Sequence, residues 1–195
     1  MKCTVSEGMH SYVISIPSLR LAFKIYKGYM LKNAVKEYKI LRMLSVKGLP
    51  VPKPYFLYLG ERIILAREYI EGEHFIDFIK RERPEKIAIA FKTLIEIAHM
   101  LDCENVFLDE LSFPTKNIIV KSEKKMFIID FERAVINPRR SNVTQILGFL
   151  YSSIKSGGYV GNKIKEFLDV DKMIEIAKKY RRERRLDDVL RLFKI

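Results

Sequence analysis

The most informative segment of this chain is Leu21-Ala22-Phe23-Lys24-Ile25-Tyr26-Lys27. Its side chains alternate between two faces, as they do in a β-strand. Leu21, Phe23 and Ile25 share one face, whereas Ala22, Lys24 and Tyr26 share the other. The alternation predicts a strand that carries Lys24 opposite its large aliphatic residues.

After this strand, residues 33–45 have helical spacing, and Asn33 is a candidate cap for the helix start. At about 100° per residue, Glu37 falls on the apolar stripe of this helix. An unpaired carboxylate in that position is costly, and Lys24 could supply the matching cation. The alternative interpretation is an ordinary strand lysine and a misassigned helix face. The apolar stripe consists of Ala34, Ile40, Leu41 and Leu44.

The rest of the chain predicts a strand-rich N-terminal part and a helical C-terminal part, which together define an α+β fold class. The boundary between the two parts falls near residues 68–72. The expected strands are 12–16, 19–27, 55–59, 62–69, 118–120 and 126–129. The expected helices are 33–45, 74–80, 84–101, 143–154 and 164–193, the last with a break near Arg185. The apolar stripe of 84–101 consists of Ile87, Phe91, Leu94, Ile95 and Ala98.

The hairpin formed by the two late strands predicts a polar pair. Asn117 precedes the first strand and Asp130 follows the second. In an antiparallel pair the start of one strand lies beside the end of the other, so we expect these side chains at the open end. An amide oxygen and a carboxylate suit Mg²⁺, which completes its shell with phosphates and water. The alternative is that Asn117 caps a turn and Asp130 is a solvated strand end.

Two further features carry weaker signals. Ser6, Gly8 and Ser11 lie just before the first expected strand and offer hydroxyl and backbone N–H groups to a phosphate. Asp109 and Glu110 end an apolar run, and one of them could accept a proton from a hydroxyl nucleophile. Taken alone, both features also fit ordinary solvated turns.

Charge narrows the range of partners. The chain of 195 residues has 36 Lys and Arg against 24 Asp and Glu, a net charge of +12 that indicates a polyanionic partner. No apolar run approaches the ~20 residues needed to cross a bilayer, and the first residues do not resemble a signal peptide. Cys3 and Cys103 are too far apart to indicate a disulfide framework. We therefore expect a cytoplasmic protein with no membrane contact.

The order of these features resembles the parts of protein-kinase phosphoryl transfer. Residues 21–27 resemble the lysine-bearing strand of RIO-type atypical kinases, and residues 6–13 resemble the glycine-poor RIO phosphate loop. Residues 68–72 (EYIEG) look like the hinge that holds adenine, and residues 128–134 (IIDFERA) stand where most kinases have Asp-Phe-Gly. The match covers Ser6 to about Gln145 and is most similar to the small RIO-like Ser/Thr kinases predicted in archaea.

The resemblance implies a minimal two-lobed protein-kinase-like fold, with an antiparallel N-lobe sheet carrying one helix and a mainly helical C-lobe. It implies one domain over 1–195, divided into an N-lobe (1–67), a hinge (68–72) and a C-lobe (73–195). It also implies ATP and Mg²⁺ as cofactors of a RIO-like protein kinase or ATPase, with phosphoryl transfer to Ser/Thr hydroxyls of a protein substrate or of the chain itself. Ribosomal RNA or a ribosome precursor is the further partner that it suggests for the basic surface.

The resemblance also assigns roles to individual residues. Lys24 would hold the α- and β-phosphates and pair with Glu37, while Asn117 and Asp130 would bind Mg²⁺. The phosphate loop would consist of Ser6, Gly8 and Ser11. Backbone groups around Glu68, Tyr69 and Ile70 would hold adenine. Either Asp109 or Glu110 would be the catalytic base, and Glu110 is favoured because Leu111 follows it.

Several positions depart from the family pattern. The His-x-Asp catalytic motif aligns with Leu108-Asp109-Glu110, so leucine stands in place of histidine and glutamate in place of aspartate. Relative to the usual spacing of the family, two extra residues separate Glu110 from Asn117. Glu132 replaces the glycine of the metal motif, and Arg67 lies near the back of the expected adenine pocket.

These departures leave two alternatives to an active protein kinase. One is a catalytically weak pseudokinase that serves as an RNA-, ribosome- or protein-binding module. The other is a small-molecule phosphotransferase of the aminoglycoside- or choline-kinase type, which would usually carry a larger helical substrate lobe.

Overall fold

A computed structural model describes residues 3–114 and 117–195 of the chain. Contacts within the chain divide it into two compact units. The first consists of residues 1–72 with 127–133, and the second of residues 73–126 with 134–195. The lobe boundaries expected from the sequence (1–67, 68–72 and 73–195) stay a prediction.

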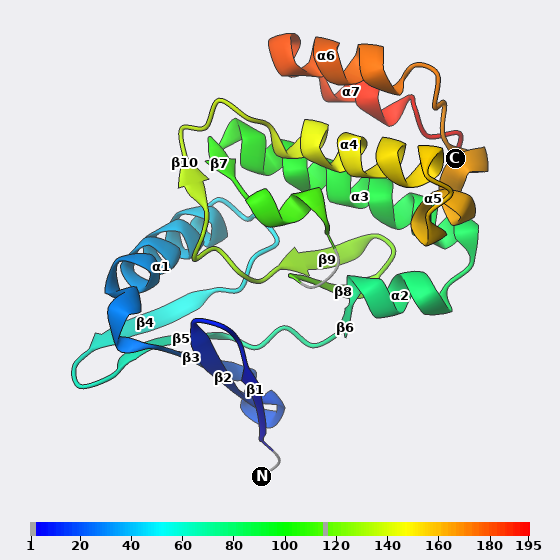
Figure 1. The fold of residues 1–195 in the computed structure, drawn as a ribbon. Coiled ribbons are helices and arrows are strands. Elements are labelled where there is room, and N and C mark those ends of the chain that lie inside the picture. The colour runs from blue at the N-terminus through cyan, green and yellow to red at the C-terminus, as the bar shows by residue number, and fades with distance from the viewer. Residues whose placement is uncertain (1–2, 115–116) are drawn as a thin grey trace. The chain divides into compact units, whose positions relative to one another are not determined.

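The first unit is built on a five-stranded antiparallel sheet (Figure 1). Its strand order is β1-β2-β3-β5-β4, so β3 is the central strand. One long helix, α1 (Leu31–Val46), packs against β4 and β5. The strands are β1 (Thr4–Glu7), β2 (Ser11–Ile16), β3 (Leu21–Tyr26), β4 (Pro54–Leu59) and β5 (Ile63–Glu68).

Helix α1 begins earlier than the sequence predicts. Its N-cap residue is Met30, and no side chain caps it, so the expectation that Asn33 caps this helix is wrong. Asn33 lies inside the first turn, where its side chain is free to bond elsewhere. The short 3₁₀ turn Gly28–Met30 leads directly into the helix and replaces the predicted cap.

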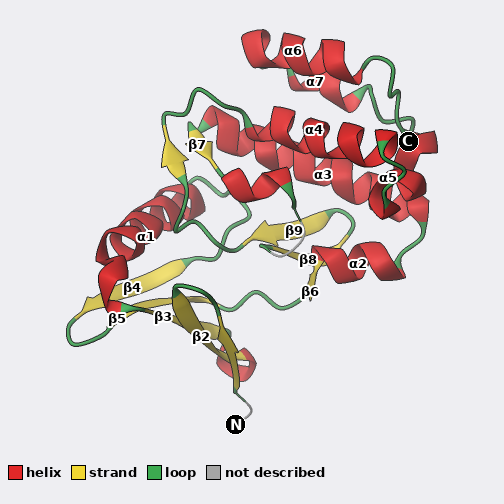
Figure 2. Ribbon diagram, in the orientation of Figure 1, coloured by secondary structure: helices red, strands yellow, loops and turns green. Residues whose placement is uncertain are grey.

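The second unit is mainly helical (Figure 2). Its longest helix is α3 (Pro84–Cys103), against which α4 (Asn142–Lys155) and α5 (Tyr159–Ile164) pack. All five residues of the predicted α3 stripe are fully buried, so this helix face is confirmed. The remaining helices are α2 (Phe75–Arg81), α6 (Met173–Glu183) and α7 (Leu186–Leu190).

The end of the chain is less helical than predicted. Residues 165–172 interrupt the expected helix 164–193, because Leu168 forms an isolated bridge with Phe193 instead of continuing α5. The second interruption, between α6 and α7, falls at Arg184 and Arg185 as expected.

Two small sheets complete the topology. One contains β7 (Val106–Phe107) and β10 (Val135–Ile136), and the other has the order β6-β8-β9. The predicted late hairpin corresponds to β8 (Ile118–Ser122) and β9 (Lys125–Ile128), while β6 is Glu73–His74. The boundary between the two units falls within β9: Met126 belongs to the second unit and Phe127 to the first. No helix among the described residues is long and apolar enough to cross a bilayer.

Candidate functional site

The candidate site is centred on Lys24, in the middle of β3. The predicted alternation is present, with Ala22, Lys24 and Tyr26 on the more buried face of the strand. Only 2% of Lys24 is exposed. Because a buried ammonium is stable only when paired, its neighbours must supply negative charge.

Glu37 supplies the first of these charges. It lies on α1 among the buried apolar residues that the sequence predicts, and it has no exposed surface. Its Oε2 lies 2.8 Å from Lys24 Nζ and accepts a hydrogen bond of 2.7 Å from the Tyr26 hydroxyl. The Lys24–Glu37 ion pair joins the sheet to its helix.

Two more carboxylates reach the same ammonium from the segment after β9. Asp130 Oδ1 lies 2.9 Å from Lys24 Nζ, and Glu132 Oε2 lies 3.0 Å from it. Lys24 therefore has three carboxylate partners, two of which are nearly buried. Glu132 lies two positions after Asp130, where the Asp-Phe-Gly motif of most kinases has glycine, so a kinase with that motif would lack this third carboxylate.

Two side chains hold that segment through its backbone. Asn33 Nδ2 donates to Glu132 O over 3.0 Å, and the Arg67 guanidinium donates to Ile129 O. Arg67 also lies 3.9 Å from Glu37 Oε1. Asn33 and Arg67 thus fix the backbone on both sides of Asp130.

The charges shift the pKa values of the cluster. Burial alone would lower the pKa of the Lys24 ammonium, but Glu37 and Asp130 outweigh it and hold that pKa above its ordinary value. Burial alone would raise the pKa of the Asp130 carboxyl, and the Lys24 ammonium reverses this, so the pKa lies below its usual range. Burial, reinforced by Glu37, raises the pKa of the Tyr26 phenol. Lys24 is therefore charged and Asp130 ionised at neutral pH.

The same cluster has the donor set of a divalent-cation site. One carboxylate oxygen from each of Glu37, Asp130 and Glu132 lies within 4.8 Å of the others. Asp130 is the most accessible of the three, with 32% of its side chain exposed against 9% for Glu132 and none for Glu37. These hard oxygen donors suit Mg²⁺, and Asp130 is the one best placed to meet a cation from solution.

The predicted phosphate loop is the tip of the β1–β2 hairpin. Ser6 lies in β1 opposite Val13, and Ser11 is the buried first residue of β2. The Gly8 N–H donates to Ser11 O over 2.8 Å, so that amide serves the turn itself. The role of Ser6, Gly8 and Ser11 in phosphate binding stays a prediction.

The predicted hinge begins at Glu68, the last residue of β5. The Glu68 and Tyr69 amides donate to Lys53 O and Arg20 O, over 2.8 and 2.9 Å. Within the described residues, the Ile70 amide forms no such backbone bond. Of these three residues, Ile70 therefore has the amide best suited to the predicted contact with adenine.

In the second unit, Asp109 and Glu110 begin a 3₁₀ turn over Asp109–Ser112. Helix α4 holds the backbone that leads into it. Asn142 Oδ1 accepts from Leu108 N over 2.9 Å, and Gln145 Nε2 donates to the carbonyls of Leu108 and Asp109 over 2.8 and 3.0 Å. The two candidate bases therefore start from a fixed backbone.

Sequence reasoning missed some of these contacts. Tyr26 could have been found, since it lies two positions from Lys24 on the same strand face. The roles of Asn33, Asn142 and Gln145 could not, because each side chain bonds to backbone distant in sequence. Asn117 lies directly before β8, as predicted.

Comparison with known proteins identifies the family. The model of the RIO domain matches residues 9–147, well over half of the chain. The protein belongs to the RIO family of kinase-type phosphotransferases, which confirms the resemblance seen in its sequence. The predicted α+β kinase-like fold class is confirmed as well.

A solved structure supports the fold. The chain is similar to the Cydia pomonella granulovirus kinase, with a TM-score of 0.52 and 16% sequence identity over 67% of this chain. The match spans 50% of the viral kinase, and at this identity it shows the fold alone. A search of curated proteins found no match.

Proposed function

We propose that this protein is an ATP- and Mg²⁺-dependent kinase that transfers a phosphoryl group to Ser or Thr hydroxyls, including its own. The observation that carries the proposal is the cluster around Lys24, in which the ammonium lies within 3.0 Å of Glu37, Asp130 and Glu132. Phosphate binding requires a cation, and metal binding requires an accessible carboxylate. The cluster places the two side by side.

The residues fit both cofactors. Asp130 is ionised and partly exposed, so its carboxylate is open to a divalent cation. In this proposal Asp130 would hold the metal together with Asn117, and Lys24 would neutralise the α- and β-phosphates while Glu37 orients it. ATP would supply the phosphoryl group, and Mg²⁺ would supply a further positive charge.

The remaining roles follow the family pattern. The backbone of residues 68–70 would receive adenine, with the Ile70 amide as donor, and Ser6, Gly8 and Ser11 would border the phosphates. Glu110, or Asp109 in its place, would accept the proton of the attacking hydroxyl. Phosphoryl transfer depends mainly on positioning and charge, which suits a site without a conventional His-x-Asp motif.

The test separates binding from turnover. Purified protein is expected to gain thermal stability with ATP and Mg²⁺ together, and Asp130→Asn should lose that gain. The matched control is Asp188→Asn, because Asp188 forms its ion pairs within the second unit and has no proposed contact with nucleotide. Radiolabelled phosphate transfer should then depend on Glu110 or Asp109. Absence of any Mg²⁺-ATP effect on the melting temperature would contradict the proposal.

A second candidate function is a pseudokinase that binds RNA, a ribosomal particle or a protein. The observation favouring it is Glu132, whose carboxylate lies against Lys24 where phosphates would need access. This candidate is preferred if nucleotide binds but no phosphate transfer is detected to the protein or to lysate, in wild type and Glu132→Gln alike. Strongly salt-dependent binding to RNA would identify the polyanion.

A further inference from the structure

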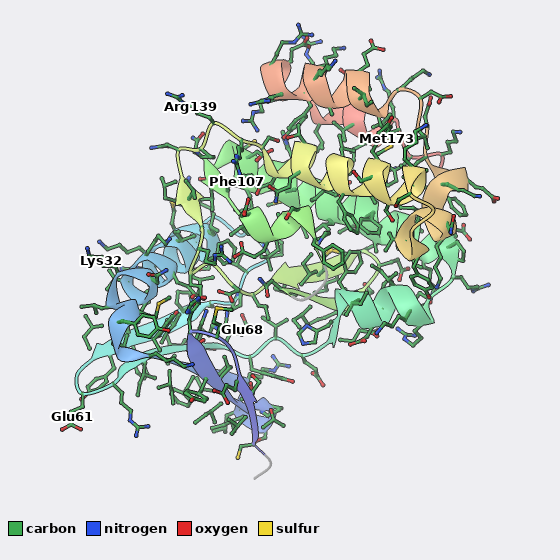
Figure 3. All side chains as sticks on the ribbon, viewed as in Figure 1. Lys32, Glu61, Glu68, Phe107, Arg139 and Met173 are labelled. Atoms are coloured by element: carbon green, nitrogen blue, oxygen red, sulfur yellow. The ribbon has the colours of Figure 1, made fainter. Side chains whose placement is uncertain are left out.

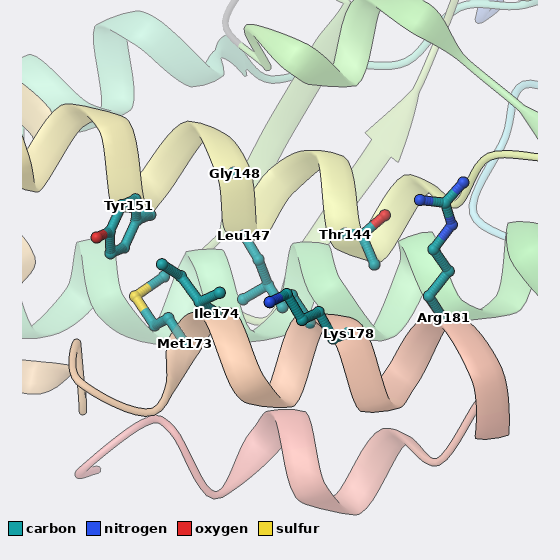
Figure 4. A pocket seen from close by; sticks show the side chains of 9 residues that line it. Thr144, Leu147, Gly148, Tyr151, Met173, Ile174, Lys178 and Arg181 are labelled. Carbon is teal, nitrogen blue, oxygen red and sulfur yellow. The ribbon is translucent and has the colours of Figure 1, made fainter.

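A groove lies between α4 and α6 in the second unit, and none of its lining residues belongs to the proposed phosphotransfer site. Its volume is about 230 Å³. Figure 4 shows the lining side chains projecting from both helices into the space between them. The lining residues on α4 are Thr144, Leu147, Gly148 and Tyr151, and those on α6 are Met173, Ile174, Ala177, Lys178 and Arg181.

Gly148 is unusual in this setting. It is exposed in the interior of α4, where glycine weakens a helix relative to alanine. A Cβ atom built on Gly148 would meet nothing within 4 Å, so packing within the described chain does not require glycine. The missing side chain leaves the helix backbone open to close approach from the groove.

The groove lining includes aliphatic side chains from both helices. Ile174 is 46% exposed, and Leu147 and Met173 are buried beneath the groove. Aliphatic groups offer no hydrogen bonds, so this part of the groove favours an apolar side chain.

The groove has unpaired positive charge at one end. Several cations near the end of the chain form ion pairs: Lys179 with Asp188, Arg184 with Asp102 and Arg185 with Glu183. Lys178 and Arg181, one helical turn apart, pair with no carboxylate among residues 3–114 and 117–195. They are therefore available to a carboxylate from outside.

We propose that this groove binds an acidic peptide segment of a protein partner. One hydrophobic side chain of the segment enters beside Gly148 and Ile174, and neighbouring Asp or Glu side chains pair with Lys178 and Arg181. An RNA strand fits less well, because only two of the lining residues, Lys178 and Arg181, are cations, which is too few for a row of phosphates.

The experiment measures fluorescence anisotropy of labelled decapeptides titrated into the full-length protein without nucleotide. Each peptide has one Leu, Ile, Met or Phe flanked by Asp and Glu, and each has a counterpart with Ser at the apolar position. We expect at least one peptide to bind tenfold more tightly than its Ser counterpart. Gly148→Met, which fills the groove from α4, and Arg181→Glu should each weaken that peptide tenfold or more.

The matched control is Arg182→Glu, which makes the same charge change on the neighbouring exposed residue outside the groove lining. It should change the affinity less than threefold. Gly148→Met should melt no lower than wild type, because its Cβ enters open space. If Gly148→Met melts lower than wild type, Gly148→Ala and Lys178→Glu are measured in its place. Lys178→Glu should then weaken peptide binding tenfold or more.

Four results would overturn the proposal. In the first, no peptide surpasses its Ser counterpart. In the second, Arg182→Glu weakens binding as much as Arg181→Glu, so the attraction is general charge. In the third, filling the groove has no effect. In the fourth, a single-stranded RNA 20-mer displaces the peptide and shows the same dependence on Gly148 and Arg181.

Discussion

Lys24 Nζ lies 2.9 Å from Asp130 Oδ1, although 106 positions separate these residues in the sequence. One comes from the central strand of the first unit, and the other from the segment after β9 that packs in the same unit. This contact places the proposed phosphate-binding cation beside the proposed metal-binding carboxylate. Glu132 Oε2 lies 3.0 Å from the same ammonium, so a further carboxylate lies beside this pair.

Replacing Glu132 by glutamine should strengthen nucleotide binding. The carboxylate lies 3.0 Å from Lys24 Nζ, where it competes with phosphates for the ammonium and repels them. Removing one buried like charge should raise the affinity for Mg²⁺-ATP about tenfold, or about 1.4 kcal/mol. Calorimetric titration measures this change.

Glutamine is the suitable replacement because Asn33 bonds to the Glu132 backbone carbonyl, which the change leaves in place. The matched control is Glu123→Gln in the β8–β9 turn, which should leave the affinity unchanged. Weaker binding in Glu132→Gln would instead assign Glu132 to the metal site.

Glu37→Ala should destabilise the protein strongly. The change removes the buried partner of both the Lys24 ammonium and the Tyr26 hydroxyl. Breaking a buried ion pair from one side costs about 3–5 kcal/mol in free energy of unfolding. Urea denaturation measures the loss, and Glu61→Ala, in the exposed β4–β5 turn seen in Figure 3, should change stability by less than about 0.5 kcal/mol. A loss of under about 1 kcal/mol for Glu37→Ala would contradict the assigned burial.

Stability should depend on pH through Asp130. Because its folded-state pKa is depressed, its contribution is present above the ordinary Asp pKa of about 3.9 and is lost as pH falls through the lower folded value. Lys24 has a raised folded-state pKa, so its contribution is present below about 10.4 and is lost only as pH rises through the higher folded value.

Urea unfolding of wild type and Asp130→Asn at a series of pH values tests this dependence. The difference in free energy of unfolding should be constant from about pH 5 to about pH 9 and shrink below about pH 3.9. A difference that persists undiminished at the lowest pH would show that the Asp130 charge does not stabilise the fold.

Local periodicity was enough to place Lys24 and Glu37. The alternation of β3 and the helical spacing of α1 depend on neighbouring residues alone, and the structure confirms both. The sequence could not show which face of β3 is more deeply buried, because both faces contain apolar residues. The face of Lys24 is covered by Glu37 and by the segment after β9, which is distant in sequence.

The features that sequence reasoning missed depend on distant partners. Asn33 looks like a helix cap, but its amide bonds to Glu132 O, 99 positions away. The stretch 165–172 contains neither Gly nor Pro to end a helix, and it is interrupted where Leu168 pairs with Phe193. Local pattern cannot anticipate either contact.

Asn142→Ala should impair both stability and turnover. The Asn142 side chain is fully buried, accepts from Leu108 N and donates to Val106 O and Asp102 Oδ1. Its removal leaves buried backbone groups unpaired, at about 1–3 kcal/mol each. Because the same contacts hold the backbone before the two candidate bases, phosphate transfer should fall even at temperatures where the variant stays folded.

Gln145→Ala separates the positioning of the base segment from general stability. Gln145 is only half-buried and contacts this segment through the carbonyls of Leu108 and Asp109. We expect a loss of less than about 1 kcal/mol in free energy of unfolding. Because a small displacement of a catalytic group is costly, the phosphate-transfer rate should fall about tenfold or more. Rate measurements at saturating Mg²⁺-ATP, with affinity measured in parallel, check this expectation. A normal transfer rate in Gln145→Ala, alongside a slow one in Asn142→Ala, would show that α4 supports the fold and does not position the base.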